Sequence, residues 1–115
     1  MNAKNISVLF STAEVFPLVK TGGLADVSYA LPKALRQMGV DIRLLLPGYP
    51  TLLEHLALIE VCEPISLFPN VAPARVLAGF IDGDLPIYVL DCPSLYQREG
   101  GPYQDQAGNE WWDNV

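Results

Sequence analysis

Two predominantly apolar runs on either side of an amphipathic stretch constrain the fold of this chain most strongly. The runs are "ISVLF" at residues 6–10 and "DIRLLLP" at residues 41–47. Such runs are typical of parallel strands that are covered on both faces. Between them, apolar residues recur at spacings of three and four, as on one face of a helix, at Leu24, Val27, Leu31, Leu35 and Met38. The sequence therefore predicts a βαβ unit over residues 6–46, the start of an α/β, Rossmann-like fold.

The intervening helix has recognisable boundary signals. We expect it to begin between Gly22 and Leu24 and to stop at Gly39, because glycine readily takes the left-handed conformation that ends helices. Pro32 lies inside the apolar stripe and removes one backbone donor, so we expect a kink or a restart near Leu31. The apolar stripe is expected to be the buried face of this helix.

Residues 51–85 show shorter strand patterns separated by turn residues. Three candidate strands are "LALIEV", "PISLF" and "ARVLAGFI", and "DGD" at residues 82–84 predicts a hairpin turn. Residues 51–60 fit a helix or a strand. "PIYVLD" at residues 86–91 predicts a further central strand, and residues 92–115 predict an ordered loop rich in glycine and aromatic side chains.

Charge and cysteine content exclude several kinds of function. The 115-residue chain has a formal net charge of -6. This charge argues against general nucleic-acid binding, which depends on clustered Lys and Arg to neutralise phosphates. Residues 1–50 contain five cationic side chains and only three carboxylates. We therefore expect an anion to bind near the N-terminal third of the chain. Cys62 and Cys92 do not have the spacing of zinc ligands. We expect both to be buried free thiols, which is typical of a cytoplasmic protein. The first apolar run is too short for a signal peptide or a membrane span.

The stretch "LVKTGGLADV" places a cation and two glycines where the first strand gives way to the helix. In open α/β sheets the loop after the first strand is a usual ligand site, and a helix N-terminus attracts anions. Lys20 adds a full charge, while Gly22 and Gly23 leave the backbone accessible, which suits a phosphate or diphosphate. The stretch is neither of the common glycine-rich nucleotide motifs. The alternative is a glycine turn with a solvated lysine.

Longer motifs resemble the glycogen synthases of bacteria and the starch synthases of plants. These are "STAEVFPLVKTGGLADVSYALPKALRQMGVDIRLLLPGYP" and "VLDCPSLYQREGGPYQDQAGNEWWDN". The resemblance implies a two-lobed glycosyltransferase of the GT-B type with a hairpin-rich insertion around residues 57–85. It implies that this chain is the first, truncated part of the N-terminal lobe. The implied reaction is glucose transfer from ADP-glucose to the non-reducing end of an α-1,4-glucan, with retention of configuration.

The resemblance also implies roles for single residues. Lys20 matches the lysine that binds the sugar nucleotide, and Gly22 and Gly23 match the glycines beside the diphosphate. Three further residues match positions around the transferred glucose or the acceptor, namely Glu14, Asp26 and Tyr103. Without the resemblance, Asp26 would be explained by the helix dipole and Glu14 by solvation. No metal or other cofactor is implied.

Two questions stay open at the level of sequence. Trp111 and Trp112 could stack on glucan rings or pack into an interior. Because the second lobe and a histidine-bearing segment of the family are absent, we expect the isolated chain to hold only half a site and to be inactive. The alternative from another class is a stand-alone module that binds phosphate or glucan without chemistry. A sucrose or trehalose type of enzyme is disfavoured by the Lys-Thr-Gly-Gly-Leu stretch.

Overall fold

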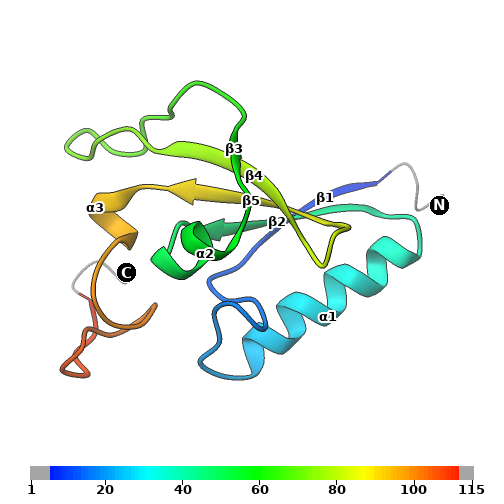
Figure 1. The fold of residues 1–115 in the computed structure, drawn as a ribbon, viewed down its shortest axis with the longest axis horizontal. Helices are drawn as coiled ribbons and strands as arrows, with labels where there is room; N and C mark the ends of the chain where they lie inside the picture. The colour runs from blue at the N-terminus through cyan, green and yellow to red at the C-terminus, as the bar shows by residue number, and fades with distance from the viewer. Residues whose placement is uncertain (1–5, 112–115) are drawn as a thin grey trace.

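The computed structural model describes residues 6–111 and shows a five-stranded sheet with its helices packed alongside (Figure 1). The strand order is β1-β2-β5-β4-β3. β1, β2 and β5 are parallel to one another, β4 is antiparallel to β5, and β3 is antiparallel to β4. The elements in chain order are β1 (Ser7–Ser11), α1 (Gly23–Gln37), β2 (Asp41–Pro47), α2 (Pro50–His55), β3 (Ile59–Glu60), β4 (Arg75–Ile81), β5 (Leu85–Asp91) and α3 (Pro93–Tyr96).

The predicted βαβ unit is confirmed. β1 pairs with β2 in parallel register, from Ser7 opposite Asp41 to Ser11 opposite Leu45, and α1 connects them. The helix ends as the sequence predicts, because Gly39 takes a φ of 91°. The amide of Gly39 donates to the Arg36 carbonyl, and the amide of Val40 donates to the Leu35 carbonyl. These hydrogen bonds satisfy carbonyls of the last helical turn.

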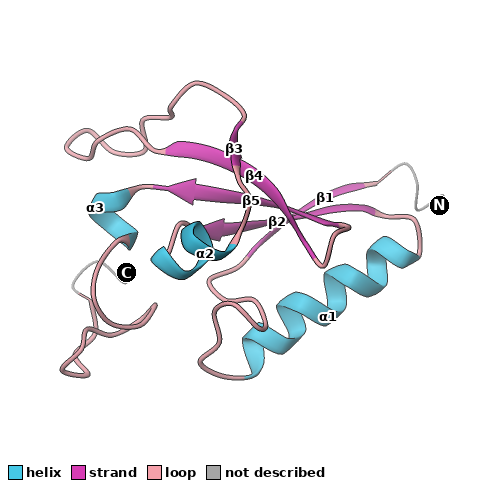
Figure 2. Ribbon diagram, viewed as in Figure 1, coloured by secondary structure: helices cyan, strands magenta, loops and turns pink. Residues whose placement is uncertain are grey.

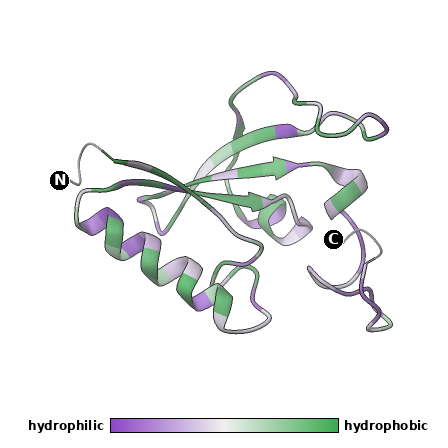
Figure 3. Cartoon of the chain, turned by 180° about the vertical axis from the view of Figure 1, so that it is seen from behind, coloured by the Kyte–Doolittle hydropathy of each residue, from purple (hydrophilic) through white to green (hydrophobic). Residues whose placement is uncertain are grey.

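The expected buried face of α1 is wrong. Val27 and Leu31 are exposed, whereas Ala25, Ser28 and Pro32 are buried. The alternation of hydrophobic and hydrophilic turns along α1 is visible in Figure 3. Periodicity identifies an amphipathic helix, but contacts with its neighbours set its rotation.

Polar contacts at two faces of α1 fix that rotation. The Ser28 hydroxyl lies 2.8 Å from the Thr12 hydroxyl in the loop after β1. On another face, the Tyr29 hydroxyl donates to Asp82, and the Lys33 ammonium lies 3.4 Å from the same carboxylate. The buried residues of α1 are all small, namely Ala25, Ser28 and Pro32, which lets the helix pack closely on the sheet.

The expected restart of the helix near Leu31 is also wrong. α1 runs as one element from Gly23 to Gln37, with Pro32 inside it. The ring of Pro32 is buried, so its apolar contacts offset the hydrogen bond that proline cannot make.

The second half of the chain adds the hairpin predicted at "DGD". β4 and β5 pair antiparallel, and both Asp82 and Gly83 take positive φ angles in the turn that joins them. β5 is central, because it pairs with β2 on its other side. The ambiguous residues 51–60 contain most of helix α2 and the whole of the short strand β3. "PISLF" forms no strand and contributes one isolated bridge at Ile65, because a proline and an irregular loop flank it.

The core lies on one face of the sheet. Leu44 and Leu46 of β2 pack there with Ile87 and Val89 of β5, and α2 contributes Leu52. Figure 2 shows α2 in cyan beside the magenta strands of the sheet. The other face is less covered, since Leu9 of β1 is 58% exposed. The expectation that the first strand is covered on both faces is therefore wrong for this chain.

The parallel strands direct their carboxyl ends to the same edge of the molecule. In Figure 1 this edge holds α2, α3 and the loop that follows α3. The loop between β1 and α1 also starts from this edge, because β1 is parallel to β2. No helix in the range 6–111 combines the length and apolar character needed to cross a membrane.

Candidate active site

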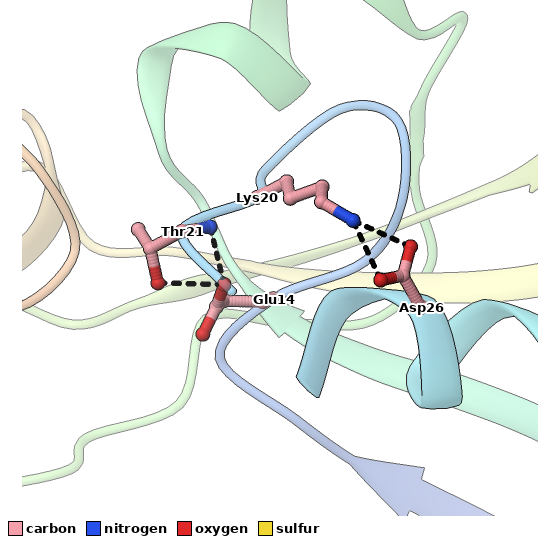
Figure 4. A network of polar contacts seen from close by, with 4 residues as sticks. All are labelled: Glu14, Lys20, Thr21 and Asp26. Carbon is pink, nitrogen blue, oxygen red and sulfur yellow. Dashed lines mark hydrogen bonds and ion pairs between the residues drawn. The ribbon is translucent and has the colours of Figure 1, made fainter. Parts of the chain in front are cut away.

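Lys20 lies in the loop that leads into α1, and it is held by an acidic side chain of that helix. Its ammonium donates to both carboxylate oxygens of Asp26 at 2.6 Å, as Figure 4 shows. The ammonium also lies 5.5 Å from the centre of the Phe16 ring. Both members of the ion pair are about half exposed, so an anion from solvent can reach Lys20 and compete with Asp26.

The two glycines leave open space at the start of α1. Gly22 is the N-cap residue, and no side chain caps the helix there. A β-carbon placed on Gly22 or Gly23 would meet no atom within 4 Å. The first backbone amides of a helix have no partner within the helix, and they carry partial positive charge. The predicted combination of cation, open backbone and helix N-terminus is therefore present in the structure.

Glu14 lies between this loop and the C-terminal part of the chain. Only 3% of its surface is exposed. Its Oε1 accepts hydrogen bonds from the Thr21 amide at 2.6 Å and the Thr21 hydroxyl at 2.8 Å. Its Oε2 accepts a hydrogen bond from the Tyr103 hydroxyl at 2.6 Å. Burial raises the pKa of Glu14, but the hydrogen bonds from Tyr103 and Thr21 outweigh it and hold this pKa below the ordinary value.

Tyr103 connects Glu14 to a large cavity at the same edge of the sheet. Burial, together with the hydrogen bond to the Glu14 carboxylate, raises the pKa of Tyr103 to about 12. The phenol therefore stays protonated and donates to Glu14 at neutral pH. The Tyr103 residue is 38% exposed and lines the cavity.

The cavity has a volume of about 1100 Å³ and is bounded by the ends of several elements. Arg98 and Glu110 are among its charged lining residues. The Arg98 guanidinium lies 4.2 Å from the centre of the Trp111 ring, and the indole nitrogen of Trp111 donates to the Gly101 carbonyl at 3.0 Å. Five aromatic side chains contribute to the lining, namely Tyr49, Phe68, Tyr96, Tyr103 and Trp111. Aromatic faces with nearby polar groups suit the apolar faces and hydroxyls of sugars.

Comparison with known proteins identifies the family of this chain. The sequence pattern of the starch synthase catalytic domain matches residues 7–115. The chain belongs to the starch synthase catalytic domain family. It is 51% identical over 116 residues to the glycogen synthase of Nitrosomonas eutropha, covering 97% of this chain and 23% of that protein. It is 49% identical over 116 residues to the glycogen synthase of Nitrosomonas europaea, with the same coverage of both chains.

A solved starch synthase structure confirms the fold class. The catalytic domain of starch synthase IV from Arabidopsis thaliana, bound to ADP and acarbose, is 27% identical and superimposes with a TM-score of 0.71. The match covers 89% of this chain and 22% of that one. The prediction of an α/β part of a GT-B glycosyltransferase, made from the sequence motifs, is thus confirmed. The chain spans about a quarter of the length of these starch and glycogen synthase relatives.

The structure brings the predicted site residues of this starch synthase family member into two neighbouring groups. One group gathers at the start of α1, namely Lys20, Gly22, Gly23 and Asp26, and Tyr103 lines the cavity. Glu14 connects them, since it contacts Thr21 and Tyr103. Trp111 lines the cavity, whereas Trp112 lies outside the described residues.

Sequence reasoning missed three cavity residues of this family member. Tyr49 follows β2, whereas Tyr96 and Arg98 follow β5, so all three lie beyond carboxyl ends of parallel strands. That placement is the signal that could have identified them. The rings of Tyr49 and Tyr96 meet edge to face at 5.9 Å, and burial raises the pKa of Tyr49 to about 12.

The cysteine and metal predictions have separate outcomes. Cys62 and Cys92 are both free thiols, as predicted, but Cys62 is exposed because it lies in the irregular loop after β3. Among residues 6–111, no three His, Cys, Asp or Glu side chains gather closely enough to hold a metal ion. That no metal is needed stays a prediction.

Glu14 should make the stability of the chain depend on pH in acid. Its folded-state pKa lies below the ordinary value of 4.5, so its carboxylate stabilises the fold fully above that pH. This contribution is lost as the pH falls through the folded-state value. We expect the difference in free energy of unfolding between the wild-type chain and E14Q, measured in urea, to shrink from pH 6 to pH 3. A difference that grows on acidification would contradict this assignment.

Proposed function

We propose that this chain supplies part of the active site of a glycogen synthase. The enzyme would transfer glucose from ADP-glucose to the non-reducing end of an α-1,4-glucan, with retention of configuration, in the cytoplasm. The observation that carries the proposal is the exposed ammonium of Lys20 beside the open N-terminus of α1. Membership of the starch synthase catalytic domain family supports it.

On the donor side, the proposed role of Lys20 follows from the charge that develops in the reaction. Breaking the bond between the anomeric carbon and the phosphate leaves negative charge on ADP, while the sugar becomes positive. The Lys20 ammonium and the first backbone amides of α1, which Gly22 and Gly23 leave accessible, would stabilise the departing diphosphate, and one such donor contributes roughly 3 kcal/mol in other enzymes. Asp26 would release Lys20 when the anion arrives and could then accept hydrogen bonds from sugar hydroxyls.

On the acceptor side, the aromatic cavity is proposed to hold the glucan. The Arabidopsis starch synthase was solved with ADP and acarbose, which supports a nucleotide and an oligosaccharide as ligands of this chain. Tyr103 would contact the sugar with its ring while its hydroxyl stays on Glu14, and its partial exposure supports this role. Trp111 would offer a second aromatic surface.

A second candidate function is a binding module without catalysis. Both the Lys20 loop and the aromatic cavity are built from residues of this chain, which supports this candidate. The module would bind phosphate or glucan in the same two places.

The two candidates differ in what the purified 115-residue chain should do. If the chain is a half-site of the synthase, ADP-glucose should raise its unfolding temperature, because a ligand that binds only the folded state stabilises it. We expect no transfer of labelled glucose to glycogen by this chain, and no effect of EDTA on the thermal shift. A shift with maltoheptaose but none with ADP-glucose would favour the module, and glucosyl transfer by the chain would refute the half-site.

A further inference from the structure

The Glu14 carboxylate joins two segments that are far apart in the sequence. Thr21 belongs to the loop that carries Lys20, and Tyr103 belongs to the loop that lines the aromatic cavity. Glu14 and Tyr103 are 89 residues apart. Figure 4 shows the carboxylate turned toward Thr21, beside the ion pair of Lys20 and Asp26.

The hydrogen bonds of Glu14 leave little room for a substrate. Oε1 already accepts two donors from Thr21, and Oε2 accepts the Tyr103 hydroxyl. With 3% of the residue exposed, a sugar hydroxyl has no open path to these oxygens. A charged acceptor that receives three donors makes strong hydrogen bonds and holds its partners in place. These contacts indicate that Glu14 acts through its neighbours.

The backbone at Glu14 gives the carboxylate a fixed base. The next residue, Val15, is fully buried and exchanges two backbone hydrogen bonds with Val19, at 3.0 and 2.9 Å. The Glu14 carbonyl accepts the Thr12 hydroxyl at 3.0 Å. The Glu14 side chain therefore cannot easily move with either loop. Movement of the Lys20 loop or the Tyr103 loop must break hydrogen bonds to its carboxylate.

We propose that Glu14 is a positioning residue that couples the Lys20 loop to the Tyr103 loop, so that nucleotide binding and glucan binding favour one another. The coupling rests on the proposed function, because it concerns the two ligands assigned there. An ADP molecule at Lys20 orders the Thr21 backbone, which orients Glu14 and so the Tyr103 ring in the cavity. By thermodynamic linkage, a glucan in the cavity strengthens ADP binding by the same factor.

The ligand-free chain allows a direct test of whether Glu14 connects the two loops. In amide NMR spectra, Y103F is expected to shift the Thr21 and Gly22 signals, because the donor to Glu14 Oε2 is lost. The matched control is Y88F, which removes a hydroxyl that pairs with Arg43. If Y103F leaves the Thr21 amide signal at its wild-type position, the proposed connection of the two loops through Glu14 is wrong.

Titrations with ADP and maltoheptaose test the coupling itself. We expect saturating maltoheptaose to tighten ADP binding to the wild-type chain by about fivefold or more, a usual size for coupling between sites. E14Q should reduce this factor to about one, whatever its effect on the affinity for each ligand alone. The control D91N removes another carboxylate that is 3% exposed and should keep the factor.

The outcomes separate this inference from the proposed function. If both ligands bind but the coupling factor is one in the wild-type chain, or is unchanged in E14Q, the inference fails and the proposed function stands. If the wild-type chain binds neither ligand, the proposed function fails and the coupling falls with it. The NMR comparison then still decides whether Glu14 joins the two loops.

Discussion

Replacing Lys20 with methionine is expected to weaken ADP binding by about 10- to 100-fold, because a hydrogen bond between charged groups contributes roughly 1.5–3 kcal/mol. The substitution has a second consequence, since it leaves the Asp26 carboxylate unpaired beside the diphosphate. We therefore expect the double variant K20M/D26N to recover part of the lost affinity. Isothermal titration of the purified chain with ADP measures both effects.

Stability and a matched control distinguish this binding role from a structural one. The Lys20–Asp26 pair is about half exposed, so it should contribute at most about 1 kcal/mol to folding. Lys33 lies further along α1 and pairs with Asp82, so K33M should leave ADP binding unchanged. Equal losses of affinity in K20M and K33M would show that ADP responds to net charge and not to this loop.

Replacing Leu44 with alanine is expected to lower the free energy of unfolding by about 2–5 kcal/mol, the usual cost of a large cavity in a core. Leu44 is fully buried in the centre of β2. Because small domains are only marginally stable, this variant should be largely unfolded at 37 °C. Urea unfolding followed by circular dichroism measures the change.

Leu31 is the matched control for this prediction. It is also a leucine, but it lies on the stripe of α1 that is exposed in the structure, at 44%. L31A should therefore change the free energy of unfolding by about 0.5 kcal/mol or less. A cost for L31A comparable to that for L44A would show that the apolar stripe is buried, as the sequence pattern alone predicts.

The regular part of the fold follows from local sequence signals. The second strand has the predicted bounds of 41–47, and Gly39 ends α1 with the positive φ that glycine favours. The rotation of α1 does not follow from its own sequence, because Tyr29 and Ser28 fix it through contacts with Asp82 and Thr12. Such contacts join distant segments, and hydrophobic periodicity does not contain them.

The same distinction applies to the candidate site. Lys20, Gly22 and Gly23 were predictable because a cation and bare backbone at the start of a helix have a local physical meaning. The partnership of Glu14 with Tyr103 was not predictable, because it depends on how the C-terminal loop returns to the carboxyl end of β1. The aromatic cavity likewise forms only when loops after β2 and β5 meet.

The most direct test of the central claim is glucosyl transfer by a chimera. This chain would replace the aligned 116 residues of the Nitrosomonas eutropha glycogen synthase, to which it is 51% identical. We predict that the chimera transfers labelled glucose from ADP-glucose to glycogen, and that K20M lowers its rate by about 100-fold while K33M does not. A folded chimera without transfer, or one in which K20M is fully active, would contradict the claim that this chain supplies half of the synthase site.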